Sequence, residues 1–76
     1  MPEFQQELDA RNESCPMPVM KTKKALKSLA SGEVLHVMAT DPASVQDISA
    51  LMQSQPAQIL EQNEEGGTYH FYLKHD

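Results

Sequence analysis

The apolar residues of this chain switch between two spacings, and the switches predict the order of its secondary-structure elements. Apolar residues at every second position, a spacing typical of strands, occur in residues 4–10, 33–40, 57–62 and 68–74. A helical spacing of three or four occurs in residues 18–31 and 42–55. The predicted order is therefore β-α-β-α-β-β.

Short polar and proline-containing segments mark where the two helices begin and end. Gly32 is placed to end the first helix, and Pro56 to end the second. Asp41 can cap the second helix, whose first residue is Pro42, because proline's missing N–H is no loss in the first turn. The first helix should turn one side toward the sheet, namely Val19, Thr22, Leu26, Leu29 and Ala30.

The length of 76 residues fits one domain, residues 1–76, with a single core layer between helices and sheet. The expected fold is an α/β two-layer sandwich, in which two helices cover one face of a mixed four-stranded sheet. The first two strands should be parallel, and the segment "NEEGG" should form a hairpin turn. The carboxyl ends of those two strands then share one edge with the amino ends of both helices, which places Cys15 and Asp41 together.

Charge is distributed unevenly along the chain. The net charge of −5 argues against general nucleic-acid binding, which needs a basic surface. Residues 28–73 contain six acids and no Lys or Arg. Five of the six basic residues precede that segment: Arg11, Lys21, Lys23, Lys24 and Lys27.

The sequence also bears on where the protein works. No apolar run approaches the roughly 20 residues that span a bilayer, and the polar start "MPEFQQELD" lacks the features of a signal peptide. A single cysteine cannot form an internal disulfide, which agrees with a reducing compartment. We expect a cytoplasmic protein.

Cys15, the one thiol of the chain, stands at the expected start of the first helix in the segment Cys-Pro-Met-Pro. The helix dipole and the unpaired N–H groups there favour a thiolate, which predicts a pKa below the ordinary value. Pro16 and Pro18 have no N–H, so donors to the sulfur should come from Met17 and Val19. The prolines should matter for presenting the thiol more than for folding.

An exposed thiolate can take a sulfane sulfur from a persulfide and later release it, and a second cysteine would compete by forming a disulfide. The alternative interpretation of Cys15 is a small buried core residue. His36, His70 and His75 could be suggested as metal ligands with Cys15, but no pair has the close spacing of a zinc site, so no metal is expected. For Asp41, a helix cap is favoured over proton transfer.

The lysines of the first helix form a candidate surface for a partner. The helical period turns them outward as one sector with two methionines, next to the thiol. Such a patch suits an acidic partner surface, and a solvated helix face is the alternative. The candidate partner-binding residues are Met17, Met20, Lys21, Lys23, Lys24 and Lys27.

The segments "LDARNESCPMPVMKTKKAL" and "SGEVLHVMATDPASVQDI" resemble the TusA family of sulfur-carrier proteins, also called SirA-like. The hallmark of that family is Cys-Pro-x-Pro at the start of the first helix, and the resemblance implies the two-layer sandwich expected above. It extends residue by residue to Cys15, Pro16, Pro18, Asp41 and Pro42. Met17 departs from it, because the residue between the prolines is often acidic in the family, and this leaves the identity of the partner open.

The resemblance also implies a function. Cys15 would accept a persulfide sulfur from a cysteine desulfurase or a rhodanese-like donor and pass it to a DsrE-like or other acceptor protein. That sulfur would serve 2-thiouridine in tRNA, molybdenum cofactor or sulfur oxidation. The chain would be a sulfurtransferase-type carrier rather than a stand-alone enzyme, with no cofactor apart from the covalent persulfide. The alternative is a regulatory or RNA- or protein-binding module, because the fold also resembles the C-terminal domain of a translation initiation factor.

Overall fold

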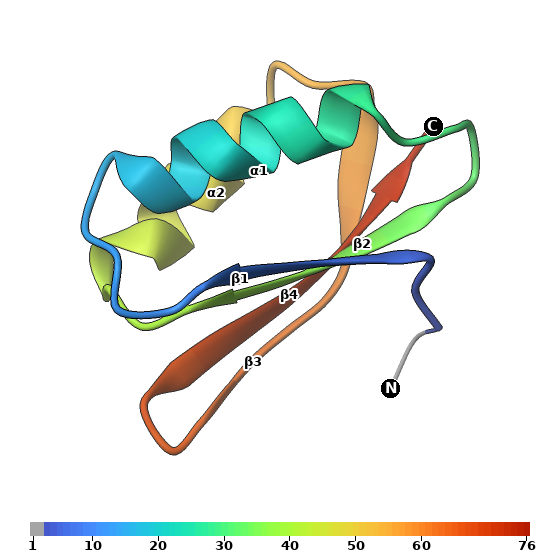
Figure 1. The fold of residues 1–76 in the computed structure, drawn as a ribbon. Coiled ribbons are helices and arrows are strands. Elements are labelled where there is room, and N and C mark those ends of the chain that lie inside the picture. The colour runs from blue at the N-terminus through green and yellow to red at the C-terminus, as the bar shows by residue number, and fades with distance from the viewer. Residues whose placement is uncertain (1–2) are drawn as a thin grey trace.

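The computed structural model describes residues 3–76, and their elements follow the predicted order β-α-β-α-β-β (Figure 1). The elements are β1 (Gln6–Ala10), α1 (Met17–Lys27), β2 (Val34–Ala39), α2 (Ala43–Met52), β3 (Ala57–Glu65) and β4 (Thr68–His75). No helix in this part of the chain is long and apolar enough to cross a membrane.

The four strands form one mixed sheet in the order β1-β2-β4-β3. β1 and β2 are parallel, and β4 is antiparallel to both of its neighbours, β2 and β3. Both helices lie on the same face of the sheet (Figure 1). The predicted two-layer architecture is therefore confirmed.

The core lies between the helices and the sheet. Strand alternation turns one set of residues toward the helices, and the side chains of these residues are buried. The sheet contributes Leu35, Val37, Ala39, Phe71 and Leu73, and the helical layer contributes Leu26, Leu29 and Ile48. The other residues of β2 and β4, including His36 and Tyr72, point to the face that has no helix.

The first helix differs from the prediction at its C-terminal end. α1 ends at Lys27 instead of residue 31, because the next two N–H groups bond to carbonyls three residues back: Ser28 to Ala25 at 3.1 Å and Leu29 to Leu26 at 3.2 Å. Leu29 still reaches the core, but the chain then turns away and Ala30 is exposed. The prediction that Ala30 faces the sheet is wrong.

The second helix and the hairpin lie close to their predicted positions. α2 begins at Ala43, one residue after Pro42, and ends at Met52, before Pro56. In the hairpin, β3 runs on to Glu65, so the turn is shorter than "NEEGG". Its two glycines, residues 66 and 67, take positive φ angles of 59° and 84°, as that turn requires.

Candidate functional site around Cys15

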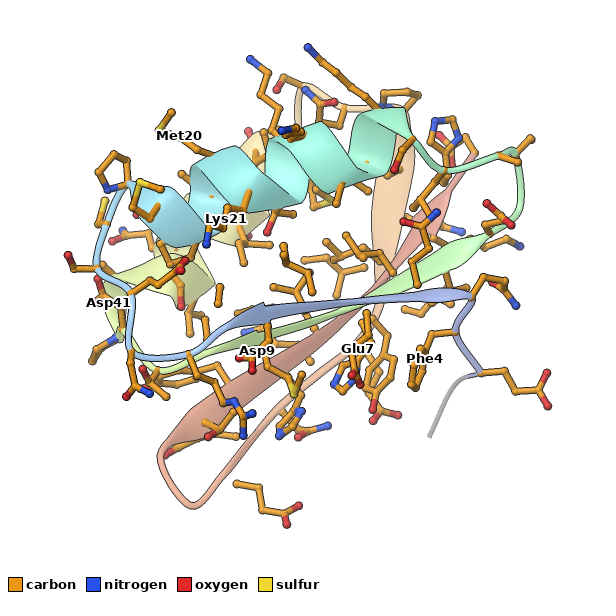
Figure 2. All side chains as sticks on the ribbon, viewed as in Figure 1. Phe4, Glu7, Asp9, Met20, Lys21 and Asp41 are labelled. Carbon is orange, nitrogen blue, oxygen red and sulfur yellow. The ribbon has the colours of Figure 1, made fainter. Side chains whose placement is uncertain are left out.

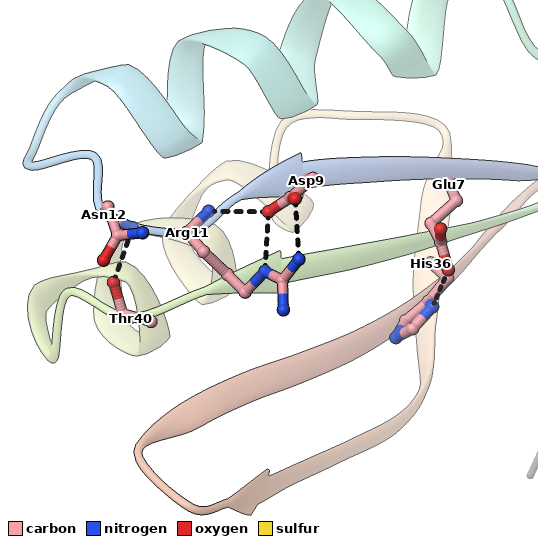
Figure 3. Close-up of polar contacts among 6 residues, drawn as sticks. All are labelled: Glu7, Asp9, Arg11, Asn12, His36 and Thr40. Atoms are coloured by element: carbon pink, nitrogen blue, oxygen red, sulfur yellow. Dashed lines mark hydrogen bonds and ion pairs between the residues drawn. The ribbon is translucent and has the colours of Figure 1, made fainter.

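Cys15 lies where the sequence predicted it, in the loop between β1 and α1. That loop lies at the end of the sheet where β1 and β2 end and both helices begin (Figure 1). Its side chain is exposed, so it is not a core residue. The Asn12 N–H donates to Thr40 Oγ1 at 2.8 Å, which joins the loop before Cys15 to the end of β2 (Figure 3). The thiol is therefore presented on a loop that is fastened to the sheet.

Asp41 does more than cap a helix. Its Oδ1 accepts the N–H of Ala43 at 3.0 Å, at the start of α2, and its Oδ2 accepts the N–H of Cys15 at 2.8 Å. These two bonds lower the pKa of the Asp41 carboxyl, with the bond from Ala43 the larger cause. Asp41 thus ties the cysteine loop to the second helix.

Asp47 is a site residue that the sequence analysis missed. The Cys15 Sγ lies 3.0 Å from Asp47 Oδ2, so the thiol donates a hydrogen bond to that carboxylate. Asp47 lies in the second turn of α2 and is half-buried. The contact joins residues 32 positions apart, so no local sequence motif predicts it. Only the placement of α2 beside the start of α1 brings the two together.

The predicted lowering of the Cys15 pKa is wrong. The hydrogen bond to Asp47 is the largest cause raising the pKa of the thiol, followed by desolvation by neighbouring atoms and the negative charges of Asp47 and Asp41. The Met17 N–H, a predicted donor to the sulfur, bonds to the Ser14 carbonyl at 2.9 Å. The sulfur therefore points toward carboxylates of the α2 side rather than toward N–H groups of α1.

The prolines of the Cys-Pro-Met-Pro segment have different surroundings. Pro16, joined to Cys15 by a cis peptide bond, is exposed, as is Pro42 at the start of α2. Pro18 is fully buried, and its carbonyl accepts a hydrogen bond from the Thr22 hydroxyl at 2.8 Å. Pro18 therefore belongs to the core as well as to the motif, whereas the prediction that the prolines matter for presenting the thiol more than for folding stays a prediction.

Four of the six predicted partner-binding residues line a shallow groove on the outer side of α1: Met20, Lys23, Lys24 and Lys27. Met20 is 57% exposed and points away from the sheet (Figure 2). Met17 is also exposed, at 42%. Lys21 departs from the prediction, because it is half-buried and its ammonium pairs with the carboxylate of Glu13.

The histidines do not approach Cys15 as a group. His36 Nε2 lies 2.9 Å from His70 Nδ1, and His36 Nδ1 lies 3.1 Å from Glu7 Oε2 (Figure 3 shows the contact with Glu7). This cluster occupies the helix-free face of the sheet, away from the cysteine edge. Within residues 3–76, no three His, Cys, Asp or Glu side chains are grouped so that they could hold a metal ion.

Fold and site together define a small two-layer α/β protein that presents one thiol at the amino end of a helix. The family model described as sulfurtransferase TusA matches residues 6–75, and the chain belongs to the TusA family. A sulfur carrier protein TusA from Allochromatium vinosum is 47% identical over 97% of both chains. One from Pseudomonas entomophila is 42% identical over 88% of this chain and 84% of its own.

Solved structures give the same assignment. A SirA-like protein from Desulfitobacterium hafniense superposes with a TM-score of 0.72 and 26% sequence identity. The match covers 92% of this chain and 96% of the other. The resemblance seen in the sequence is thereby confirmed.

Proposed function

We propose that this protein carries sulfane sulfur on Cys15 between two partner proteins. The observation that carries the proposal is the exposed thiol on a loop tied down by Asp41, in a chain whose relatives bear the name sulfur carrier protein. The sulfur is held covalently as a persulfide, and no further cofactor is invoked. The chain's one cysteine suits this task, because a second thiol nearby would attack the persulfide.

We further propose that the donor is a cysteine desulfurase or a rhodanese-like protein and that the acceptor is DsrE-like or a similar protein. The sulfur would then reach 2-thiouridine in tRNA, molybdenum cofactor or a sulfur-oxidation pathway. These assignments rest on the family. We propose that the carrier works in the cytoplasm, where a free thiol stays reduced. The chain acts in this scheme as one carrier domain rather than as a stand-alone enzyme.

A delivery experiment tests this relay. Carrier loaded with ³⁵S-labelled sulfur is mixed with a purified DsrE-like acceptor, and the label on each protein is followed after non-reducing gel electrophoresis. We expect label to appear on the acceptor as it disappears from the carrier, and dithiothreitol to remove it from both. Label that stays on the carrier while the acceptor remains empty would exclude that acceptor class.

The groove on α1 is the proposed docking surface for the donor. Its three lysines surround an exposed methionine, and Lys23, Lys24 and Lys27 form no ion pair among the described residues. Long cationic side chains around an adaptable apolar centre suit an acidic partner surface. Lys21 is already paired with Glu13 and should contribute less.

Charge reversal tests the docking surface. The double substitution Lys24→Glu with Lys27→Glu should slow association with the purified desulfurase by about tenfold at low ionic strength, because surface charges act mainly on association rate. The effect should vanish near 1 M salt, where the screening length falls to about 3 Å. Stopped-flow mixing measures the rate, with Glu64→Lys plus Glu65→Lys on the hairpin as the control pair. An unchanged rate at low salt means that the lysines are only a solvated face.

A further inference from the structure

The environment of the Cys15 sulfur is acidic. Asp47 Oδ2 receives the thiol hydrogen bond at 3.0 Å, and Asp47 has no other hydrogen bond or ion pair within residues 3–76. Asp41 also lies close, but both of its carboxyl oxygens accept backbone N–H groups. Asp47 is therefore the carboxylate that faces the sulfur directly.

The two basic residues nearest to Cys15 in the sequence, Arg11 and Lys21, are paired with other carboxylates. Lys21 pairs with Glu13 of the cysteine loop, and Arg11 pairs with Asp9 at 2.9 Å. The charges that act on the Cys15 thiol are those of Asp47 and Asp41, and both raise its pKa. In the free protein the charges that act on the reactive atom are therefore negative, although the neighbouring helix carries lysines.

This acidic environment has different effects on the empty cysteine, which is a thiol, and on the loaded cysteine, which is a persulfide. A neutral thiol has a proton to donate to Asp47, and it loses that hydrogen bond when it ionises. A persulfide is a stronger acid than the thiol from which it forms, so the loaded cysteine is anionic near neutral pH. An anion on Cys15 gains no hydrogen bond from the Asp47 carboxylate and is repelled by it.

We propose that Asp47 favours release of sulfur from Cys15, because its carboxylate stabilises the empty thiol by a hydrogen bond and repels the loaded persulfide anion. The inference rests on the proposed carrier function and deepens it by giving the transfer a direction. Asp47 acts by direct contact, because its Oδ2 lies 3.0 Å from the Cys15 Sγ.

The release step balances without an added oxidant or reductant. The acceptor's thiolate sulfur attacks the outer sulfur of Cys15–S–S⁻, a new S–S bond forms on the acceptor, and the S–S bond on Cys15 breaks with its electron pair left on Sγ. The proton that the acceptor thiol released passes to Sγ. Asp47 then receives the hydrogen bond of the restored thiol. The transferred sulfur keeps its oxidation state.

The pH profile of alkylation tests the claim that Asp47 stabilises the neutral thiol of empty Cys15. The rate of reaction with iodoacetamide follows the thiolate fraction, so its midpoint reports the thiol pKa. The wild type should titrate above the ordinary cysteine value of about 8.5, and Asp47→Asn should titrate lower than the wild type. A wild-type midpoint below the ordinary value would overturn the proposal without any variant, so the test survives if Asp47→Asn fails to fold.

A sulfur-exchange equilibrium tests the claim that Asp47 disfavours the persulfide form of Cys15. Wild type and Asp47→Asn are equilibrated with a fixed mixture of glutathione and glutathione persulfide, and the loaded fraction is read by intact-mass spectrometry. Removing one like charge at this distance near the surface should raise the loaded-to-empty ratio about tenfold in Asp47→Asn. Equal ratios in both proteins would overturn the proposal.

A matched control separates the contact with the sulfur from the change in net charge. Glu3→Gln removes the same charge from an exposed residue before β1, at the opposite end of that strand from Cys15. It should leave both the pH profile and the loaded ratio at wild-type values. If Glu3→Gln shifts the ratio as much as Asp47→Asn does, the effect of Asp47 is one of net charge and the proposal is wrong.

The glutathione mixture also keeps this inference separate from the proposed relay. It supplies sulfur without any protein donor, so the equilibrium does not depend on the identity of the partners. If Cys15 loads from glutathione persulfide but not from a desulfurase, the proposed donor is wrong and the role of Asp47 is still measured.

Discussion

Cys15 and His36 each lie beside a carboxylate, but the two sites are built in opposite ways. Cys15 is exposed on a loop at the sheet edge and meets Asp47 of a neighbouring helix. His36 lies within a central strand, is 6% exposed, and contacts Glu7 of one neighbouring strand and His70 of the other. The sheet edge at Cys15 is therefore organised to give partners access to the thiol, whereas the helix-free face around His36 is organised for stability of the fold.

Stacked rings enclose the His36 cluster on the face of the sheet that no helix covers. The His36 ring lies 4.5 Å from the Tyr72 ring and parallel to it within 1°, and 5.0 Å from the Phe4 ring. Phe4 and Glu7 point to this face, away from the helices (Figure 2). Tyr72 is fully buried, and this burial is the main cause that raises the pKa of its hydroxyl. The aromatic cluster therefore covers this part of the sheet, where no helix packs.

The largest expected effect on stability is that of His36→Ala. This change removes a buried ring, its contacts with Glu7 and His70, and its stacking on Tyr72. Unfolding in urea should show a loss of roughly 2–3 kcal/mol. Sulfur loading of the folded variant should remain at the wild-type level.

His75→Ala is the matched control for that substitution. His75 lies at the end of β4, outside the cluster, and within residues 3–76 its ring bonds only to the neighbouring Asp76 carbonyl, at 2.8 Å. Its loss should cost less than half as much. If His36→Ala instead unfolds at the wild-type urea concentration, or loses sulfur loading while folded, the division of roles between the two regions fails.

Pro18→Ala should have an intermediate effect, because Pro18 belongs to both the motif and the core. Alanine leaves space where the ring was buried and gives the unfolded chain more freedom, which together should cost about 2 kcal/mol. Thermal and urea unfolding measure the loss. Pro42→Ala, at an exposed position before α2, serves as the control and should cost less than 1 kcal/mol. Equal losses for the two prolines would contradict the packing role of Pro18.

Arg11→Gln should have the smallest effect. The hydrogen bonds from Arg11 lower the pKa of Asp9 to about 2, so their stabilising effect is present above the ordinary value of 3.8 and is lost as pH falls through about 2. In the variant, the Asp9 pKa should move back toward 3.8, as followed by NMR titration of the carboxyl carbon. Stability at pH 7 should hardly change, because both side chains are exposed. An Asp9 pKa that stays near 2 would mean that Arg11 is not its cause.

The features that the sequence predicted are those set by local spacing. Alternation and helical periodicity gave the element order, and the position of Cys15 and Asp41 after successive strands placed both at one edge. The same reasoning could not find the end of α1, because the apolar pattern continues to Leu29 while the backbone bonds tighten after Lys27.

The features that the sequence did not predict depend on contacts across the fold. Asp47 meets Cys15 only after the two helices pack side by side, and that contact reverses the expected direction of the thiol pKa. His36 meets Tyr72 and Glu7 only in the register of three strands. Such pairings join residues about 30 positions apart, beyond the reach of any local pattern.

Intact-mass spectrometry tests the central claim, that Cys15 is the sulfur-carrying atom. Wild type and Cys15→Ser are incubated with a cysteine desulfurase and L-cysteine, desalted, and weighed before and after dithiothreitol. The wild type should gain one sulfur, about 32 Da, that dithiothreitol removes, and Cys15→Ser should gain none. An equal gain in Cys15→Ser, or no gain in the wild type beside a desulfurase shown to be loaded, would contradict the account.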